Sequence, residues 1–441
     1  MKPARSLIPI GTATFGPDTA RHVRTLESQL ITRLSRWGYR EIILPTFEYL
    51  DVLSVGLAPE VLEKCYKFAD WTTGRILVLR PDITAQIARI VAMGMGGAGL
   101  PLRLSYRTTV FRYEPEHAGR EREIFQVGVE LIGMDDANAD AEVLMSLIEL
   151  LKAVGLPDFK VSLGHVGFYH ALLTRSGLSE AGQRKAESAA AHKDLPALEA
   201  ILSQERLPRK KTKVIIEAAG RCGQDDVLEW GRAVAGKDVA LTRPLDRLAK
   251  VYHLLDLAGL KDHLLLDLGE SRGFDYYDGV VFDVFTSSMG TELGGGGRYN
   301  HLLGRFGRDL PSTGFALDMD RVFASLDPSV LHAGAQSVPI LLLAPLKQFG
   351  VACKLAQRLR SEGLPVIQEA VVVGKSSLMD HARDRTKKMG AVTAIVFGAP
   401  RVPAQSVILM KCTPQQKEPR LSTVECHELP HILNGPPHVS V

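Results

Sequence analysis

The sequence lacks the features that would place it in several large classes of protein. No apolar run approaches the roughly 20 residues that a membrane-spanning helix requires, which argues against a membrane protein. Residues 1–9 lack a basic segment followed by a long apolar stretch, so we expect no secretory signal peptide. The four glycines of residues 294–297 are not followed by the Lys-Ser/Thr ending of a phosphate-binding loop. We therefore expect no cofactor.

Paired cysteines are also missing. The five cysteines are scattered, their number is odd and no two form a CxxC pair; they are Cys65, Cys222, Cys353, Cys412 and Cys426. This pattern excludes a disulfide framework and a cysteine zinc site. We predict reduced thiols in a cytoplasmic protein that binds no metal.

What the chain does have is an ordinary globular composition with an uneven charge. Its 441 residues, 45% hydrophobic and 23% charged, are enough for more than one domain. The net charge of +3 hides a basic segment, because residues 338–411 carry eleven Lys and Arg against four Asp and Glu. Such a segment can bind nucleic acid, or it can be a solvated helix face, since no aromatic residues interleave with its charges. Both interpretations stay open.

Hydrophobic periodicity predicts alternating helices and strands. Helices are predicted at 18–37, from Pro81 and Asp82 onward, and at 139–154; strands at 41–45, 66–68, 75–79, 102–114 and 123–132, with a turn at 115–119 between the last two. Residues 164–260 are rich in Ala and Leu and are predicted to be mostly helical. After a linker, strand and helix patterns alternate from residue 340 to 397, which is typical of a small α/β domain with a parallel sheet.

Two segments indicate a ligand pocket. Residues 271–282 (Ser-Arg-Gly-Phe-Asp-Tyr-Tyr-Asp-Gly-Val-Val-Phe) and 294–299 (Gly-Gly-Gly-Gly-Arg-Tyr) combine a guanidinium, phenols and a glycine run that permits close approach to the backbone. On strand 123–132 the even positions place Gln126, Gly128 and Glu130 on one face. Gly128 would leave a hole suited to a ligand with an ammonium group, and a β-bulge or close helix packing explains this glycine equally well.

Arg321 lies in the first turn of a predicted helix, where its charge opposes the helix macrodipole. Asp318, three residues earlier, is at a spacing suited to an ion pair and is a good helix N-cap. The residues alone therefore favour a structural role for Arg321.

Together these segments resemble class II aminoacyl-tRNA synthetases. Residues 44–48 (Leu-Pro-Thr-Phe-Glu) resemble motif 1, a dimerisation element, residues 106–133 resemble motif 2 and residues 314–321 resemble motif 3. Residues 272–277 and 294–299 resemble the histidine motifs of histidyl-tRNA synthetase. The likeness covers about residues 17–326 and, more weakly, a C-terminal module similar to that enzyme's anticodon-binding domain. It implies an α+β fold with an antiparallel sheet core flanked by helices.

The resemblance implies a division of the chain and a histidine pocket. The core would comprise residues 1–163 and 263–326, with a helical insertion at 164–262, a linker at 327–337, an α/β domain at 338–412 and an irregular tail at 413–441. The pocket would comprise Asp82, Thr84, Arg112, Gln126, Glu130, Arg272, Tyr276 and Tyr277. Asp82 and Glu130 would bind the ammonium group of histidine, and Arg112 its carboxylate.

The chain also departs from the synthetase pattern. It has Arg80-Pro-Asp-Ile-Thr84 in place of Arg-Pro-Glu-Gly-Thr and Ile124-Phe-Gln126 in place of Phe-His-Gln, and Asp318 replaces the motif 3 glycine. An acidic group there would repel ATP and compete for Arg321. Residues 80–84, 163–167 and 193–199 instead resemble the regulatory subunit of ATP phosphoribosyltransferase, a synthetase paralogue that does not charge tRNA.

From this resemblance we predict a regulatory subunit without catalytic residues. It would form a homodimer through motif 1, assemble with the short-form ATP phosphoribosyltransferase catalytic subunit and bind L-histidine as the feedback effector of histidine biosynthesis, without nucleic acid. Two alternatives stay open. One is an active or divergent histidyl-tRNA synthetase, and the other is a protein that binds tRNA or another RNA through residues 338–411.

Overall fold

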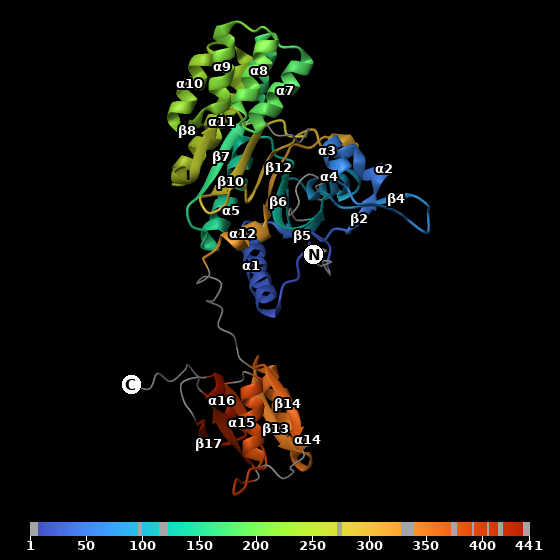
Figure 1. The fold of residues 1–441 in the computed structure, drawn as a ribbon, viewed down its shortest axis with the longest axis vertical. Helices are drawn as coiled ribbons and strands as arrows, with labels where there is room; N and C mark the ends of the chain where they lie inside the picture. The colour runs from blue at the N-terminus through green and yellow to red at the C-terminus, as the bar shows by residue number, and fades with distance from the viewer. Residues whose placement is uncertain are drawn as a thin grey trace, which may run out of the picture. The chain divides into compact units, whose positions relative to one another are not determined.

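A computed structural model describes residues 8–95, 99–113, 122–270, 276–327, 339–371, 377–389, 392–403, 405–412 and 418–434. The chain divides into two compact units, Met1–His332 and Ala333–Val441 (Figure 1). Each unit has its own sheet and its own core. None of the helices in the described ranges is long and apolar enough to cross a membrane.

The first unit is built on a sheet that has nine strands in the described part of the chain. In spatial order they are β1 (Arg40–Glu41), β5 (Leu102–Phe111), β6 (Glu123–Ile132), β12 (Ser312–Asp318), β11 (Gly294–Arg298), β10 (Val280–Thr286), β7 (Phe159–His165), β9 (Leu264–Asp267) and β8 (Cys222–Gly223). The β1–β5 and β7–β9 pairs are parallel and the others are antiparallel. The predicted α+β class with an antiparallel core is confirmed.

One face of this sheet, here called the helix face, carries the main core. Alternation along β6 sends Val127, Val129 and Leu131 to this face, as their spacing predicted. Helices α1 (Pro17–Arg36), α5 (Ala137–Ala153), α11 (Val239–Leu257) and α12 (Met319–Ser325) contribute to the same apolar cluster. The opposite face, here called the cavity face, therefore carries the intervening residues, among them Gln126 and Glu130.

A small sheet lies beside the main one and supports one wall of the cavity. Its strands are β2 (Phe47–Tyr49), β4 (Ile76–Leu79) and β3 (Lys67–Ala69), with α2 (Leu50–Leu53), α3 (Pro59–Glu63) and α4 (Ile83–Met93) packed nearby (Figure 1). Asp82 is the N-cap of α4, since its Oδ1 accepts a hydrogen bond of 2.8 Å from the Ala85 amide. The cap fixes the start of α4 at the cavity.

The predicted helical segment is present, and it also contributes to the main sheet. Besides α11 its helices are α6 (Val166–Ser176), α7 (Glu180–Ala191), α8 (Leu195–Gln204), α9 (Arg209–Gly220) and α10 (Asp225–Ala235). The sequence interpretation missed β8, which lies between α9 and α10 and pairs with β9. Its two residues are too few for period-two alternation to reveal a strand.

The second unit corrects two predictions. Its strands β14 (Val366–Val371), β13 (Ile340–Pro345), β15 (Thr393–Val396), β16 (Ser406–Lys411) and β17 (Arg420–Glu425) form one sheet, with helices α14 (Phe349–Ser361), α15 (Leu378–Lys388) and α16 (Leu429–Asn434). The strands predicted within residues 340–397 do pair in parallel, β13 with β14 and with β15, but the whole sheet is mixed because β15–β16 and β16–β17 are antiparallel. The tail after residue 412 is not wholly irregular, since it contains β17 and α16.

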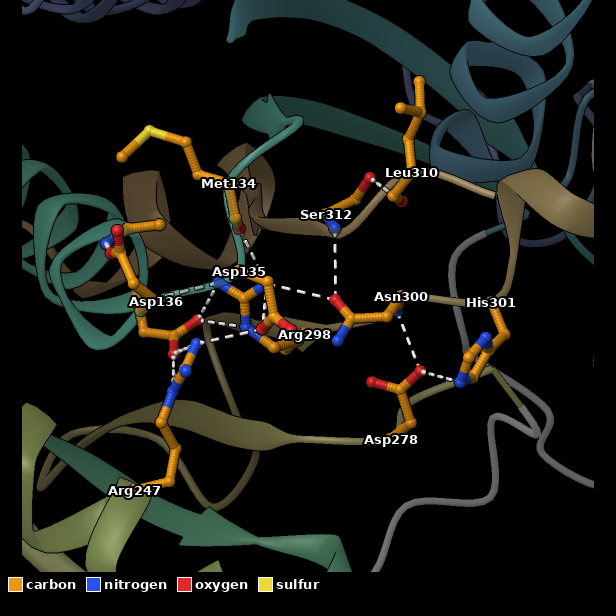
Figure 2. A network of polar contacts seen from close by, with 12 residues as sticks. Met134, Asp135, Asp136, Arg247, Asp278, Arg298, Asn300, His301, Leu310 and Ser312 are labelled. Atoms are coloured by element: carbon orange, nitrogen blue, oxygen red, sulfur yellow. Dashed lines mark hydrogen bonds and ion pairs between the residues drawn. The ribbon is translucent and has the colours of Figure 1, made fainter. Parts of the chain in front are cut away.

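A buried ion pair joins the centre of the main sheet to the helices of the helix face (Figure 2). The guanidinium of Arg298, at the end of β11, donates a 2.8 Å hydrogen bond from Nε to Oδ1 of Asp140 on α5, and another of 2.9 Å to the Met134 carbonyl. Arg247 on α11 donates to the other oxygen of Asp140 at 2.9 Å. Because Arg298 and Asp140 are only 2% and 1% exposed, these contacts compensate charges that solvent does not reach.

Candidate ligand-binding site

A cavity of about 390 Å³ opens on the cavity face of the main sheet, beside the N-terminus of α4. Seven of the eight residues predicted for the pocket line it: Asp82, Thr84, Arg112, Gln126, Glu130, Tyr276 and Tyr277. The eighth, Arg272, lies outside the described residues. The structure thus brings together side chains from segments almost 200 residues apart in the sequence. Which ligand they bind remains a prediction.

Glu130 is the most unusual group of the cavity. Its side chain is 1% exposed, and its Oε1 accepts a 2.7 Å hydrogen bond from the Thr84 hydroxyl while its Oε2 accepts one from the Tyr299 hydroxyl. Burial raises the pKa of Glu130 to about 8; the two hydroxyls act against this rise, and the charge of Asp82 adds to it. Glu130 forms no ion pair with a described residue. A cation in the cavity would favour the ionised form of Glu130 and would pair with it.

Asp82 places a second carboxylate close by. Its Oδ1 caps α4, and its Oδ2 lies 3.4 Å from the Tyr276 hydroxyl, which donates to it. Thr84 lies in the first turn of the same helix and donates its hydroxyl hydrogen bond to Glu130. The residue types that the resemblance assigned to an ammonium group therefore converge from α4 and β6.

Three tyrosines form the aromatic wall of the cavity. The ring centroids of Tyr276 and Tyr277 are 4.7 Å apart, and those of Tyr276 and Tyr299 are 5.9 Å apart with nearly perpendicular planes. Tyr299 belongs to the segment 294–299, which resembles a histidine motif, but it was not among the eight predicted pocket residues. Its hydrogen bond to Glu130 places it in the cavity, and its position two residues after the glycine run was the available signal.

The space above Gly128 is filled by Tyr106. This corrects both interpretations of the glycine, a hole for a ligand and a β-bulge or close helix packing. A Cβ at position 128 would lie 2.4 Å from the Tyr106 hydroxyl oxygen and 2.3 Å from the Phe315 carbonyl oxygen. The β5–β6 register is continuous and pairs Tyr106 with Gly128, so there is no bulge between these strands. Gly128 makes room for the cross-strand Tyr106 ring, which itself lines the cavity.

Close packing of strands also explains part of the glycine run. A Cβ on Gly296 would lie 2.0 Å from the Gly314 carbonyl oxygen on the adjacent β12. Gly314 in turn faces Glu130, whose Oε2 would lie 1.9 Å from a Cβ at that position. The close approach inferred from these glycines is therefore largely that of the protein's own strands, and only Gly294 and Gly295 of the run line the cavity.

At the other end of the cavity a polar cluster holds Arg321. Its Nη1 donates to the Glu292 carbonyl at 2.6 Å and to the Glu292 Oε1 at 3.0 Å, and it lies 3.5 Å from Asp318 Oδ2. The predicted pair with Asp318 is confirmed. Asp318 occupies the N-cap position of α12 but its side chain makes no capping bond. Glu292 was missed, because it lies 29 residues away and only the fold brings it near.

Asp318 also accepts a hydrogen bond from a residue of the predicted pocket, Gln126. Gln126 donates from Nε2 to Asp318 Oδ1 at 2.9 Å. Burial raises the pKa of Asp318, and the hydrogen bond from Gln126 and the charges of Arg321 and Arg112 partly reverse that rise. Arg112 donates from Nε to the Pro81 carbonyl at 2.8 Å and lines the cavity. Arg112 is thus the cation of this cavity best placed to meet an anionic group.

The cavity therefore suits a small zwitterion. It presents carboxylates at one end, an arginine nearby and tyrosine rings between them, all on a fixed sheet and helix. Within the described ranges, no group of three His, Cys, Asp or Glu side chains could hold a metal ion. The geometry supports binding of an amino acid by charge and ring contacts.

Comparisons with known proteins agree with this fold. The family model described as histidyl-tRNA synthetase matches residues 11–322. A protein of Geobacter sulfurreducens named ATP phosphoribosyltransferase regulatory subunit is 34% identical over 93% of this chain and 92% of its own length. One of the same name from Moorella thermoacetica is 37% identical over 87% of this chain and 96% of its own length.

A solved structure resembles most of this chain. It is titled as an ATP phosphoribosyltransferase regulatory subunit/histidyl-tRNA synthetase from Bacillus halodurans, with a TM-score of 0.76 and 28% identity. The match covers 87% of this chain and 97% of that one. On the extent of these matches, the chain belongs to the family of ATP phosphoribosyltransferase regulatory subunits, whose fold is that of histidyl-tRNA synthetase.

Proposed function

We propose that this chain is a non-catalytic regulatory subunit that binds histidine and controls a separate ATP phosphoribosyltransferase catalytic subunit. It would be required for the first step of histidine biosynthesis and for feedback inhibition of that step. The names of the relatives support the role of regulatory subunit. The lining of the cavity supports the proposed site and its effector.

The observation that carries the proposal is the buried Glu130, which has hydroxyl partners but no ion pair among the residues that the structure describes. An ionised carboxylate without a cation is costly in a buried site, and a ligand ammonium group would remove that cost. Asp82 adds a second acceptor for the same group, and Arg112 offers a guanidinium for a carboxylate. The cavity of about 390 Å³ is of the size expected for a small molecule.

The cluster around Arg321 supports the absence of adenylate chemistry. Three acceptors from Asp318 and Glu292 already surround this guanidinium. An incoming triphosphate would have to displace them and would meet two carboxylates beside the arginine. Asp318 and Glu292 thus favour a site that takes an amino acid and excludes a nucleotide.

An active histidyl-tRNA synthetase is the second candidate. It is favoured by the match to the histidyl-tRNA synthetase family model and by the presence of Arg112 and Arg321 in the motif 2 and motif 3 segments. The two candidates differ in one reaction, histidine-dependent exchange of pyrophosphate into ATP. We expect no exchange by the pure protein, and robust exchange would replace the proposed function with this one.

Nucleic-acid binding through the second unit has less support. Several of its basic groups are engaged within the unit: Arg385 with Glu369, Lys388 with Asp384 at 2.8 Å, and Arg360 with the Val366 carbonyl at 2.8 Å. These contacts fit the solvated helix face better than a surface awaiting phosphates. Salt-sensitive binding of tRNA at physiological ionic strength would contradict this part of the proposal.

We place a homodimer interface at the motif 1 region. Large apolar side chains there are exposed, with Ile43 at 91%, Phe47 at 52% and Phe68 at 42%. Phe47 and Phe68 contact each other edge to face, with centroids 6.1 Å apart. Exposed apolar clusters of this kind mark protein interfaces. Sedimentation of a monomer at micromolar concentration, unaffected by Ile43→Asp, would refute the dimer.

Reconstitution tests the proposal as a whole. The pure chain is mixed with a short-form ATP phosphoribosyltransferase catalytic subunit, and product formation is followed with and without histidine. We expect no activity from this chain alone, activity from the mixture, and inhibition of the mixture by histidine through about 1–3 kcal/mol of coupling. A catalytic subunit indifferent to the chain would refute the regulatory role, and an active mixture indifferent to histidine would refute the effector.

A further inference from the structure

A second hollow lies in the helical segment, far along the chain from every pocket residue named above. This groove, of about 450 Å³, runs between α6, α9, α10 and α11. Its floor is aliphatic and is formed by Leu172, Val214, Ile215, Val234 and Leu241. Figure 1 shows α9 and α10 adjacent to each other in the part of the first unit built from helices. The groove can therefore receive apolar side chains from outside.

The rim of the groove is cationic. Arg175 at the end of α6 and Lys210 and Lys211 at the start of α9 line it. Arg175 reaches Asp238 at 3.1 Å, and Lys211 donates to the Ser176 carbonyl at 2.8 Å. These two side chains have structural partners. Lys210 and the neighbouring Arg209 form no ion pair or hydrogen bond with a residue in the described ranges.

The position of these cations is unfavourable for the isolated helix. Helix α9 begins Arg-Lys-Lys-Thr-Lys, it has no acidic residue in its first turn, and its N-cap Pro208 offers no side-chain bond. Positive charges at a helix N-terminus oppose the macrodipole. An anionic partner lying across the rim would reverse that effect. The aliphatic floor is an independent observation that favours the same partner, because Val214 and Val234 are only half-buried there and apolar side chains of a partner would cover them.

We infer that this groove docks an acidic amphipathic helix of the catalytic partner subunit. Aliphatic side chains at positions i, i+3 or i+4 and i+7 of such a helix fill the floor, and carboxylates beside them meet Lys210 at the rim and the neighbouring Arg209. The inference rests on the proposed function, since it supplies a contact surface for that assembly.

The composition of the groove favours protein over RNA as its occupant. Proteins that hold single-stranded nucleic acid present aromatic side chains on which bases stack. Of the described residues that line the groove, none is aromatic. Aliphatic side chains at the floor match leucine, isoleucine and valine of a helix instead.

The test measures the affinity of the full-length chain for a short-form catalytic subunit by isothermal titration at two salt concentrations. One variant carries Arg209→Glu and Lys210→Glu, which reverses the rim, and a second carries Ala233→Phe, which fills the groove from an exposed position on α10. A matched control carries Arg184→Glu and Lys185→Glu on α7, exposed and outside the groove, with the same change in net charge. Circular dichroism checks that all three fold.

We expect both groove variants to weaken the complex about tenfold or more, and the control to stay within about twofold. The salt dependence of the wild-type affinity should fall in the rim variant. Unchanged affinity in both groove variants, with a normal wild-type complex, would overturn the docking assignment and leave the proposed function intact. No complex with the wild type would overturn both. Loss of tRNA binding in the rim variant with an unchanged protein complex would assign the surface to RNA instead.

Discussion

The last residue of β11 and the residue that follows it face opposite sides of one sheet, and their surroundings differ. Arg298 enters the helix face, where two carbonyls, Asn300 and Asp140 satisfy its guanidinium (Figure 2). Tyr299 enters the cavity face, where it donates to Glu130, a carboxylate with no cation among its described partners. One buried charge is fully compensated and the other is not.

The difference separates a structural group from a functional one. The network of Arg298 holds helices to the sheet, and within it burial is balanced by opposite charge. The pKa of Glu130 stays raised because its carboxyl group is buried, and the hydrogen bonds from its two hydroxyl partners only partly offset that effect. A buried group left in this state, inside a cavity, is typical of a binding site. Three experiments test this difference between Arg298 and Glu130.

The largest effect is expected from Asp140→Ala. It leaves the buried guanidinium of Arg298 without its carboxylate and removes a partner of Arg247, so the free energy of unfolding should fall by about 3–5 kcal/mol. Urea unfolding measures this change. Asp135→Ala is the control, because Asp135 is 58% exposed and lies 3.6 Å from Arg298; it should cost less than about 1 kcal/mol. Equal losses of unfolding free energy in Asp140→Ala and Asp135→Ala would contradict the structural role assigned to the buried pair of Arg298 and Asp140.

Glu130→Gln should act on binding instead of stability. It keeps the size of the side chain but removes the charge that meets an ammonium group, so histidine affinity should fall by about 2–3 kcal/mol, or 30- to 150-fold. Titration calorimetry measures the affinity. Glu142→Gln is the matched control, because Glu142 pairs with Arg103 at 2.7 Å and does not line the cavity. Normal histidine binding by Glu130→Gln would show that Glu130 does not bind the ammonium group of the ligand.

A third effect, small within any single pH unit, is a dependence of stability on pH. The pKa of Glu130 in the folded protein, about 8, lies above its ordinary value of 4.5, so the folded state binds the extra proton between these values. The contribution to stability is present below pH 4.5 and is lost as pH rises through 8, with a slope of at most about 1.4 kcal/mol per pH unit. Urea unfolding of the wild type and Glu130→Gln from pH 5.5 to 8.5 compares them. A wild-type slope no steeper than that of the variant contradicts the raised pKa.

Much of the fold followed from local patterns. The helix at Pro17–Arg36, the strands at Leu102–Phe111 and Glu123–Ile132 and the apolar face of the latter lie where periodicity predicted them. The parallel pairing of the three predicted strands in the second unit did follow, but the mixed order of the whole sheet did not, because its antiparallel pairs involve β16 and β17, which the sequence pattern did not reveal. β17 was hidden in a segment whose prolines suggested irregular structure.

The site was predictable where residue types were unusual and unpredictable where partners were remote. Glu130, Gln126 and Asp82 were indicated by polar groups on a buried strand or by a motif. Tyr106 and Glu292 were missed, because the first is placed by cross-strand register and the second by a contact over 29 residues. The partnership of Arg298 with Asp140 spans 158 residues, a separation at which no sequence pattern indicates a pair.

The glycine run in β11 has a consequence for how this strand finds its place. Four residues without side chains carry almost no information about which neighbour each should oppose, and glycine-rich strands are prone to slip. Arg298 and Tyr299 supply that information, one on each face. A slip of one residue would exchange them, carrying a guanidinium to Glu130 and a phenol to Asp140. The two acids thus align the strand as the chain folds, before any ligand arrives.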